Sequence, residues 1–155
     1  MIKILRNDGS NNNAYKIAKQ ARLIVKSIDI YKHVIELAFQ RAEYRNCIKF
    51  GREGLSNAGN NPYFKYLVSQ SYMKLNQYEN ALTTLEGIGV KPENKEEYNL
   101  LYLNILMTLE YFPEAESKIT ELLKIHTRNP RYQEFFANFH YYKKYKDGDG
   151  PDFKK

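Results

Sequence analysis

Apolar residues recur along most of this chain at intervals of three or four positions. In the stretch 14–27, Ile17, Ala21 and Ile24 share one face of a helix, which Ile28 continues. This spacing is that of an amphipathic α-helix, so we expect an all-α fold. The other face of the same stretch is basic and carries Lys16, Lys19, Arg22 and Lys26.

The sequence aligns with itself when it is shifted by about 34 residues, an interval called the period below. In each period an aromatic residue is followed three positions later by a small one: Tyr44 and Cys47, Tyr78 and Ala81, Phe112 and Ala115. Two antiparallel helices approach closely only where one side chain is short. The period therefore predicts a repeated pair of helices, which in the second period are expected at about 62–75 and 77–86.

The expected helix starts keep the same period. Asn61-Pro62 and Asn129-Pro130 stand two periods apart, and Asn is a favoured N-cap while Pro suits the first helical position. The start between them, near Glu96, lacks Pro. It carries acidic residues that favour a helix N-terminus through its dipole, namely Glu93, Glu96 and Glu97.

These residues resemble the tetratricopeptide repeat. The second period matches its pattern through Ser69, Tyr72, Tyr78, Ala81 and Leu85, and the third through Phe112, Ala115 and Ile119. The first period departs from the pattern, since Cys47 replaces Ala and Gly51 stands where a large apolar residue is usual. The resemblance implies an α-solenoid, a right-handed superhelix of helix-turn-helix repeats. A plain helical bundle without repeat stacking is the alternative.

The resemblance also suggests how the chain is divided. We expect a flexible segment at 1–13, a repeat domain at 14–146 and a disordered tail at 147–155. Within the domain, an N-terminal helix precedes repeats at about 28–61, 62–95 and 96–129, and a capping helix follows at 130–145. An aromatic stripe on that helix is expected to cover the third repeat: Tyr132, Phe135, Phe136, Phe139 and Tyr142. Tyr141 and Tyr145 fall outside the stripe.

Composition limits the class of protein. A chain of 155 residues fits one domain, and its single cysteine, Cys47, excludes an internal disulfide and fits a reducing compartment. No apolar run reaches the roughly 18 residues of a membrane helix. The segment 1–13 makes a poor signal peptide, because its apolar run is short and ends in Asp8-Gly9-Ser10. We expect a cytoplasmic protein without a membrane span.

The net charge of +6 is unevenly distributed. Residues 1–55 and 131–155 carry an excess of positive charge, whereas residues 56–130 are slightly acidic. The basic stretch 14–27 could therefore contact an acidic partner, nucleic acid or a membrane surface. The simpler interpretation is a packing helix with a solvated Lys/Arg face.

No pattern for catalysis is present. His33, His126 and His140 lie in different expected elements, and none has another His or Cys at metal-ligand spacing. Gly-rich phosphate loops and the GxSxG motif are absent. Cys47 occupies a small-residue position, where a buried and inert thiol is expected. We expect no enzyme, cofactor, metal site or small-molecule substrate.

The resemblance implies that the first helix of each repeat lines a concave groove. Gln70, Asn104 and Asn138 lie in register and could each pair with a peptide backbone in both directions. Only Lys32 matches the clamp that holds C-terminal carboxylates in chaperone-binding relatives, so no such clamp is expected. The positions carried over are Lys32, Glu36, Phe39, Tyr63, Tyr66, Gln70, Met73, Lys74, Leu100, Asn104, Met107 and Asn138.

The expected function is therefore a non-catalytic adaptor or scaffold that binds a partner protein, as an extended peptide, in this groove. One alternative is a chaperone for secreted proteins, because the chain is similar in size and repeat number to the type III secretion translocator chaperones. Another is an assembly subunit of a larger complex or a homodimer. Nucleic-acid binding through the basic stretch is the remaining alternative.

Overall fold

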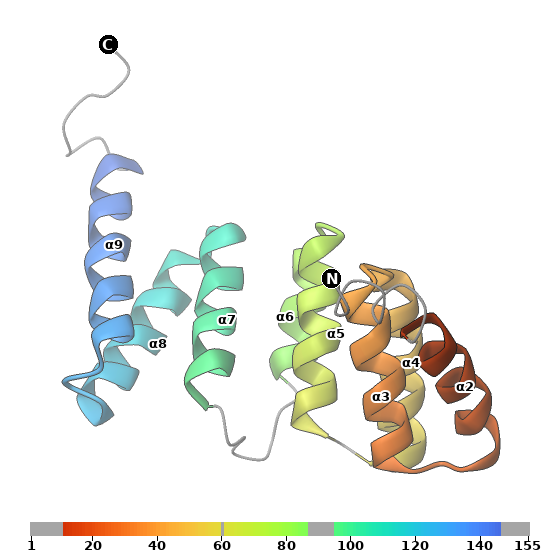
Figure 1. Cartoon of the computed structure of the whole chain (residues 1–155). Helices are drawn as coiled ribbons and strands as arrows, with labels where there is room; N and C mark the ends of the chain where they lie inside the picture. Colours follow the sequence, from red (N-terminus) through yellow and green to blue (C-terminus); the bar gives the residue numbers. More distant parts are fainter. Residues whose placement is uncertain (1–10, 60, 87–94, 147–155) are drawn as a thin grey trace, which may run out of the picture. The chain divides into compact units, whose positions relative to one another are not determined.

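The computed structural model describes residues 11–59, 61–86 and 95–146 (Figure 1). These ranges contain helices and turns and no strand, which confirms the all-α class. The expectations for residues 1–10 and for the tail at 147–155 lie outside the described residues. The helices are α2 (Asn11–Ile24), α3 (Ile28–Gln40), α4 (Tyr44–Ala58), α5 (Pro62–Lys74), α6 (Tyr78–Glu86), α7 (Lys95–Thr108), α8 (Phe112–Ile125) and α9 (Pro130–Lys146).

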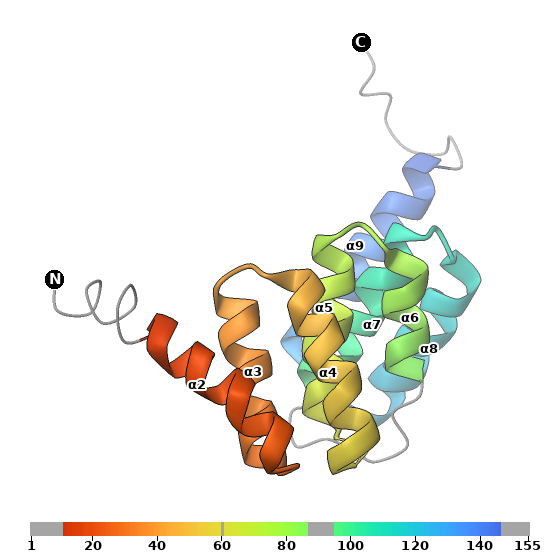
Figure 2. The same ribbon diagram turned by 90° about the vertical axis from the view of Figure 1, so that its right-hand side faces the viewer.

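Contacts divide the chain into two compact units, Met1–Tyr98 and Asn99–Lys155, called unit 1 and unit 2 below. In unit 1 each helix packs on the next one along the chain, from α2 to α6, and α3 also touches α5. Figure 2 shows α2 lying along α3. In unit 2, α9 packs on α8. None of the described helices has the length and apolarity that crossing a membrane requires.

Helix starts follow the predicted caps. The side chain of Asn61 accepts hydrogen bonds from the backbone N–H groups of Tyr63 and Phe64, at 2.8 and 3.3 Å, and Pro62 follows at the first helical position. Asn129 does the same two periods later, accepting from the N–H groups of Arg131 and Tyr132 at 3.0 and 3.1 Å. These bonds satisfy N–H groups that have no partner inside the helix.

The turns inside the three helix pairs are alike. Ala42, Asn76 and Glu110 stand one period apart, and each has a positive φ close to 60°. After each of them the next backbone N–H donates to a carbonyl five positions earlier, for example Glu43 to Ala38 at 2.9 Å. This is the Schellman ending of a helix. Sequence reasoning did not predict it, because only Asn76 is a residue type that favours this conformation.

The small residues of the period are buried. Cys47, Ala81 and Ala115 are fully inaccessible to solvent. Gly51, a departure from the repeat pattern in the sequence, has a packing reason. A Cβ at Gly51 would lie 2.2 Å from Cγ2 of Val68, so a side chain there would force the valine or one of the two helices to move.

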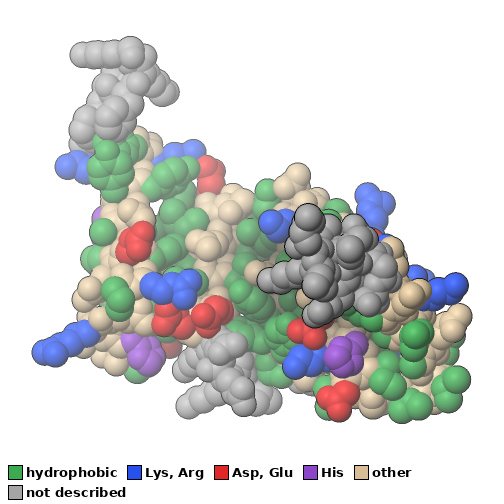
Figure 3. Space-filling view, viewed as in Figure 1, with side chains coloured by type: hydrophobic (Ala, Val, Ile, Leu, Met, Phe, Trp, Pro, Cys, Tyr) green, Lys and Arg blue, Asp and Glu red, His purple; other side chains and the backbone are tan. Residues whose placement is uncertain are grey.

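The structure corrects the expectations for the N-terminal helix. α2 begins at Asn11, three positions before the expected start, and ends at Ile24 rather than residue 27. Its packing face is also different. Tyr15 is its buried residue, whereas Ile17 and Ile24, expected on the packing face, are 66% and 84% exposed. The end of α2 and the start of α3 carry exposed hydrophobic side chains, namely Leu23, Ile24, Val25 and Ile28. Figure 3 shows hydrophobic side chains on the surface in the region of α2, at the lower right.

The aromatic stripe of α9 is only partly buried. Tyr132 and Phe139 are inaccessible, and Phe135 packs against the core of unit 2. Phe136 and Tyr142, expected on the same covered stripe, are exposed. Tyr142 nevertheless packs on Phe112 of the third repeat, with ring centres 5.7 Å apart, so its exposure does not remove it from the predicted packing role. Tyr141, expected outside the stripe, is exposed.

Candidate functional site

Two neighbouring helices of unit 1 bring several predicted groove residues together. On α3 and α5, the Tyr63 hydroxyl donates a 2.7 Å hydrogen bond to Oε2 of Glu36. The Nζ atom of Lys32 lies 5.6 Å from the centre of the same ring. Burial, followed by the Glu36 hydrogen bond and charge, raises the pKa of Tyr63 well above its usual range. Glu36 and Lys32 thus hold one tyrosine from two sides.

A second contact continues along α5. The Gln70 side chain donates from Nε2 to the Tyr66 hydroxyl at 3.3 Å. The Tyr66 ring packs at 4.8 Å, centre to centre, on the ring of Tyr98, also in unit 1. Burial and the neighbouring Tyr66 raise the pKa of Tyr98 to about 12. We define the α3–α5 surface as Lys32, Glu36, Tyr63, Tyr66 and Gln70.

Tyr98 was missed by the sequence-based prediction. It stands one period after Phe64 and one period before Tyr132, so an aromatic residue recurs at this position of the period. That recurrence could have indicated a structural role for Tyr98. Phe64 and Tyr132 are both buried core residues. Tyr98 is not among the groove positions that the resemblance implies, which in this repeat begin with Glu97 and Leu100.

The remaining groove residues of unit 1 are less tightly connected. Phe39 packs edge-on against Tyr44, with ring centres 5.5 Å apart, and against the core cluster of unit 1. Met73 is half-buried and Lys74 is exposed at the end of α5. Phe39 therefore serves mainly the packing of the first helix pair.

In unit 2 the groove residues lie on α7 and α9. Asn104 and Asn138 are exposed, and Met107 is half-buried. Leu100 packs against the core cluster of that unit, which contains Leu103 and Tyr132. A polar pair also lies inside this unit, where Asn99 donates from Nδ2 to the Tyr132 hydroxyl at 3.1 Å.

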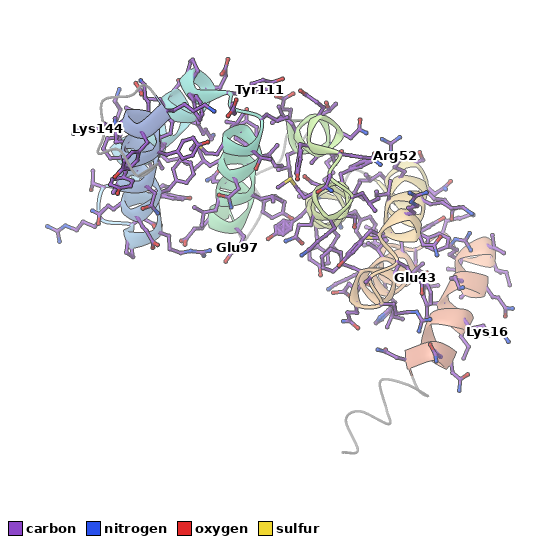
Figure 4. The ribbon with its side chains drawn as sticks, turned by 90° about the horizontal axis from the view of Figure 1, so that it is seen from above. Lys16, Glu43, Arg52, Glu97, Tyr111 and Lys144 are labelled. Carbon is purple, nitrogen blue, oxygen red and sulfur yellow. The ribbon has the colours of Figure 1, made fainter. Side chains whose placement is uncertain are left out.

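The predicted basic face of α2 is not continuous. Lys16 and Lys26 are exposed, and Figure 4 shows Lys16 on the outer side of α2. Arg22 instead faces the core: its Nε lies 2.8 Å from Oε2 of Glu53, as an ion pair without hydrogen-bond alignment. Its guanidinium also sits 4.4 Å from the centre of the Phe50 ring. The grouping of all four basic residues on one solvated face is therefore wrong for Arg22.

Lys19 is likewise engaged within unit 1, since its Nζ lies 4.4 Å from the centre of the Tyr15 ring. The Tyr15 hydroxyl donates to Glu43 at 3.3 Å, and Figure 4 places Glu43 at the turn between α3 and α4. The Tyr15–Glu43 hydrogen bond joins α2 to the turn before α4, whereas the contact between Lys19 and Tyr15 lies within α2. They leave Lys16 and Lys26 as the solvated cations of the predicted face, which weakens the case for nucleic-acid binding there.

Cys47 is buried, as expected. Burial raises the pKa of its thiol to about 11, and its Sγ lies 3.9 Å from the backbone carbonyl of Leu67. A thiol that stays protonated at neutral pH is a poor nucleophile and metal ligand. Within the described ranges, no group of three or more His, Cys, Asp and Glu side chains could hold a metal ion.

Comparison with known proteins adds no assignment. No family model matches the sequence, and neither the curated proteins nor the solved structures give a match.

Proposed function

We propose that the chain is a protein-binding module of the tetratricopeptide type that holds an extended peptide segment on its α3–α5 surface. Two observations support the repeat assignment. The second helices of the three pairs begin one period apart, at Tyr44, Tyr78 and Phe112. The turns before them share one backbone conformation. A surface formed by successive first helices is what such a repeat offers a partner.

The observation that carries the proposal is the pair of side-chain contacts at Tyr63 and Tyr66. Each hydroxyl is fixed by a neighbour, Glu36 or Gln70, and both rings are only partly buried. Side chains that are already ordered lose little conformational entropy on binding. Tyrosines held in this way combine apolar contact area with a polar end.

Gln70 supplies the group that would pair with a backbone. Its amide has two N–H donors and a carbonyl oxygen, and one N–H donates to Tyr66. The other N–H and the oxygen can bind one peptide group in both directions. Lys32 and Glu36 nearly cancel in charge, so the proposed ligand is an apolar extended segment without a strong net charge.

Peptide selection tests this proposal. The chain is used to select binders from a display library of random eight-residue peptides, and the affinities of synthetic copies are measured by fluorescence anisotropy. The double variant Tyr66→Ala/Gln70→Ala should weaken binding at least tenfold, because it removes the ring and the amide together. Thr83→Ala, an exposed change on α6 of the same unit, is the matched control and should leave affinity unchanged.

Circular dichroism should show that the double variant keeps the helicity of the original chain, so that weaker binding reflects the lost side chains and not unfolding. Failure to select any peptide would contradict the proposal. So would peptides that bind the double variant and the original chain equally.

A further inference from the structure

The end of α2 and the turn after it form an exposed apolar surface in unit 1, called the α2 tip below. It consists of Leu23, Ile24, Val25 and Ile28, of which the first three are 62%, 84% and 49% exposed. Ile17, two turns before Ile24, is also exposed and lines an apolar groove of about 370 Å³ between α2 and α3. Contiguous exposed apolar side chains mark a surface that contacts a partner.

The shape of the α2 tip indicates what kind of partner covers it. The tip lies at one end of unit 1, where α2 ends, α3 begins and α4 ends (Figures 1 and 2). The N–H group of Val25 donates to the carbonyl of Ala21 at 2.9 Å, so helical hydrogen bonding continues through Val25. Consecutive helical residues point about 100° apart, so Leu23, Ile24 and Val25 face three different sides. A flat protein surface would cover one or two of these sides, whereas a lipid layer closes around all three.

The charges at this end of unit 1 are mostly positive. Residues 11–28 include three Lys, one Arg and no Asp or Glu. Arg22 forms an ion pair with Glu53 of α4, so the charge of that carboxylate is neutralised. Residues 54–59, which complete α4 and lead out of it at the same end, are uncharged. An anionic surface is therefore attracted to the tip.

We propose that the α2 tip inserts into the surface layer of a membrane that contains anionic lipid. Lys26 directly follows Val25 and is exposed. Lys16 is also exposed and stands seven residues before Leu23 on the same side of α2, about 10 Å along the helix. With the tip at the boundary of the acyl chains, both ammonium groups reach the lipid headgroups. Asp29, exposed in the first turn of α3, opposes this attraction.

Other partners fit the α2 tip less well. Two copies of the chain that met through their tips would bring the two Lys26 side chains together, whereas phosphatidylserine carries the opposite charge. Nucleic acid is also negative, but it has no apolar layer in which Leu23, Ile24 and Val25 could be buried. The tip is separate from the α3–α5 surface, so the proposal does not depend on peptide binding.

A fluorescent label tests insertion at the tip itself. The variant Ile24→Cys, in a Cys47→Ala background, carries the fluorophore NBD and is titrated with vesicles of phosphatidylcholine and phosphatidylserine in equal parts. The emission should rise and shift to shorter wavelength, because the label leaves water. Ile125→Cys, labelled in the same way, is the matched control, since Ile125 is the last residue of α8 and is 65% exposed. An equal response at both sites, or none at Ile24, would overturn the proposal.

Variants without a label measure the affinity for the same vesicles by co-sedimentation. Leu23→Ser/Ile24→Ser should weaken binding at least tenfold, because two aliphatic side chains no longer enter the lipid. Ile125→Ser should leave it unchanged. Circular dichroism should show equal helicity for the variants and the original chain. Unchanged affinity in the double variant would contradict insertion.

Charge variants give a second result that does not depend on removing apolar side chains. Lys26→Gln should weaken binding about fivefold, and Asp29→Asn should strengthen it. Binding that is the same with vesicles of phosphatidylcholine alone would contradict the role of anionic lipid.

Light scattering of the full chain without vesicles tests the second copy as an alternative. We expect a monomer. A dimer that Leu23→Ser/Ile24→Ser abolishes would assign the α2 tip to a second copy and overturn the proposal.

Discussion

Gly51 shows how a single residue determines the spacing of two helices. In the sequence, Gly51 is a departure from the repeat pattern, because a large apolar residue is usual at this position. The structure places it against Val68, at a point where a Cβ would be only 2.2 Å from the valine methyl group. Sequence reasoning could not find this, because the distance depends on the three-dimensional crossing of α4 and α5. By contrast, burial of Cys47 was predictable, since its partners in the period are alanines.

Replacing Gly51 by Ala should destabilise unit 1 by roughly 1–2 kcal/mol. Overpacking costs about 1–3 kcal/mol, and the higher helix propensity of Ala returns up to about 1 kcal/mol. Urea unfolding followed by circular dichroism measures the change. Ser56→Ala, exposed on the same helix, is the control and should stay within about 0.5 kcal/mol. Stability equal to or above that of the original chain would show that α4 can move away from α5 at no cost.

At the scale of the helix, the boundaries were largely predictable and the faces were not. The caps at Asn61 and Asn129 are recognisable from residue type, and the structure confirms both. For α2, the spacing of Ile17 and Ile24 was a sound apolar pattern, yet Tyr15 and Arg22 face the core. Apolar residues at helical spacing predict a helix. When apolar residues occur on more than one side of it, their spacing does not predict which side the neighbouring helix will cover.

Ala42 gives a direct test of the repeated turn. It holds a left-handed backbone conformation that costs a residue with a Cβ about 1 kcal/mol and costs glycine almost nothing. Ala42→Gly should therefore stabilise the chain, by about 0.5–1 kcal/mol in urea unfolding. The same change in the middle of α9, Ala137→Gly, should destabilise it by about as much. Loss of stability in both variants would contradict the described turn.

At the scale of the whole molecule, the sequence predicted the all-α class and the succession of helices, because the repeat period is a property of the chain itself. It predicted the candidate surface only in part. Tyr63, Tyr66 and Gln70 were named, but the hydrogen bond to Glu36 and the packing on Tyr98 depend on how α3, α5 and the start of α7 meet. The groove residues of unit 2 remain predictions.

Three tyrosines of unit 1 should make the molecule less stable at alkaline pH. The pKa values of Tyr63, Tyr15 and Tyr98 are all raised, chiefly by burial, above the ordinary value near 10. Because the unfolded chain loses these protons first, stability is fully present below about pH 10 and falls as pH rises toward the folded pKa values. Urea unfolding at pH 8, 10 and 11.5 measures this, and Tyr63→Phe should reduce the fall. An identical fall in the variant would show that Tyr63 does not contribute.

The most direct test of the central claim is a map of where a peptide binds. A peptide selected from the eight-residue library is titrated into the ¹⁵N-labelled chain, and the amide shifts are followed by NMR. We predict that in unit 1 the shifts gather on α3 and α5 around Glu36, Tyr63, Tyr66 and Gln70, with α4 and α6 unaffected. Shifts centred on α4 and α6, or on the groove between α2 and α3, would contradict the proposed binding surface.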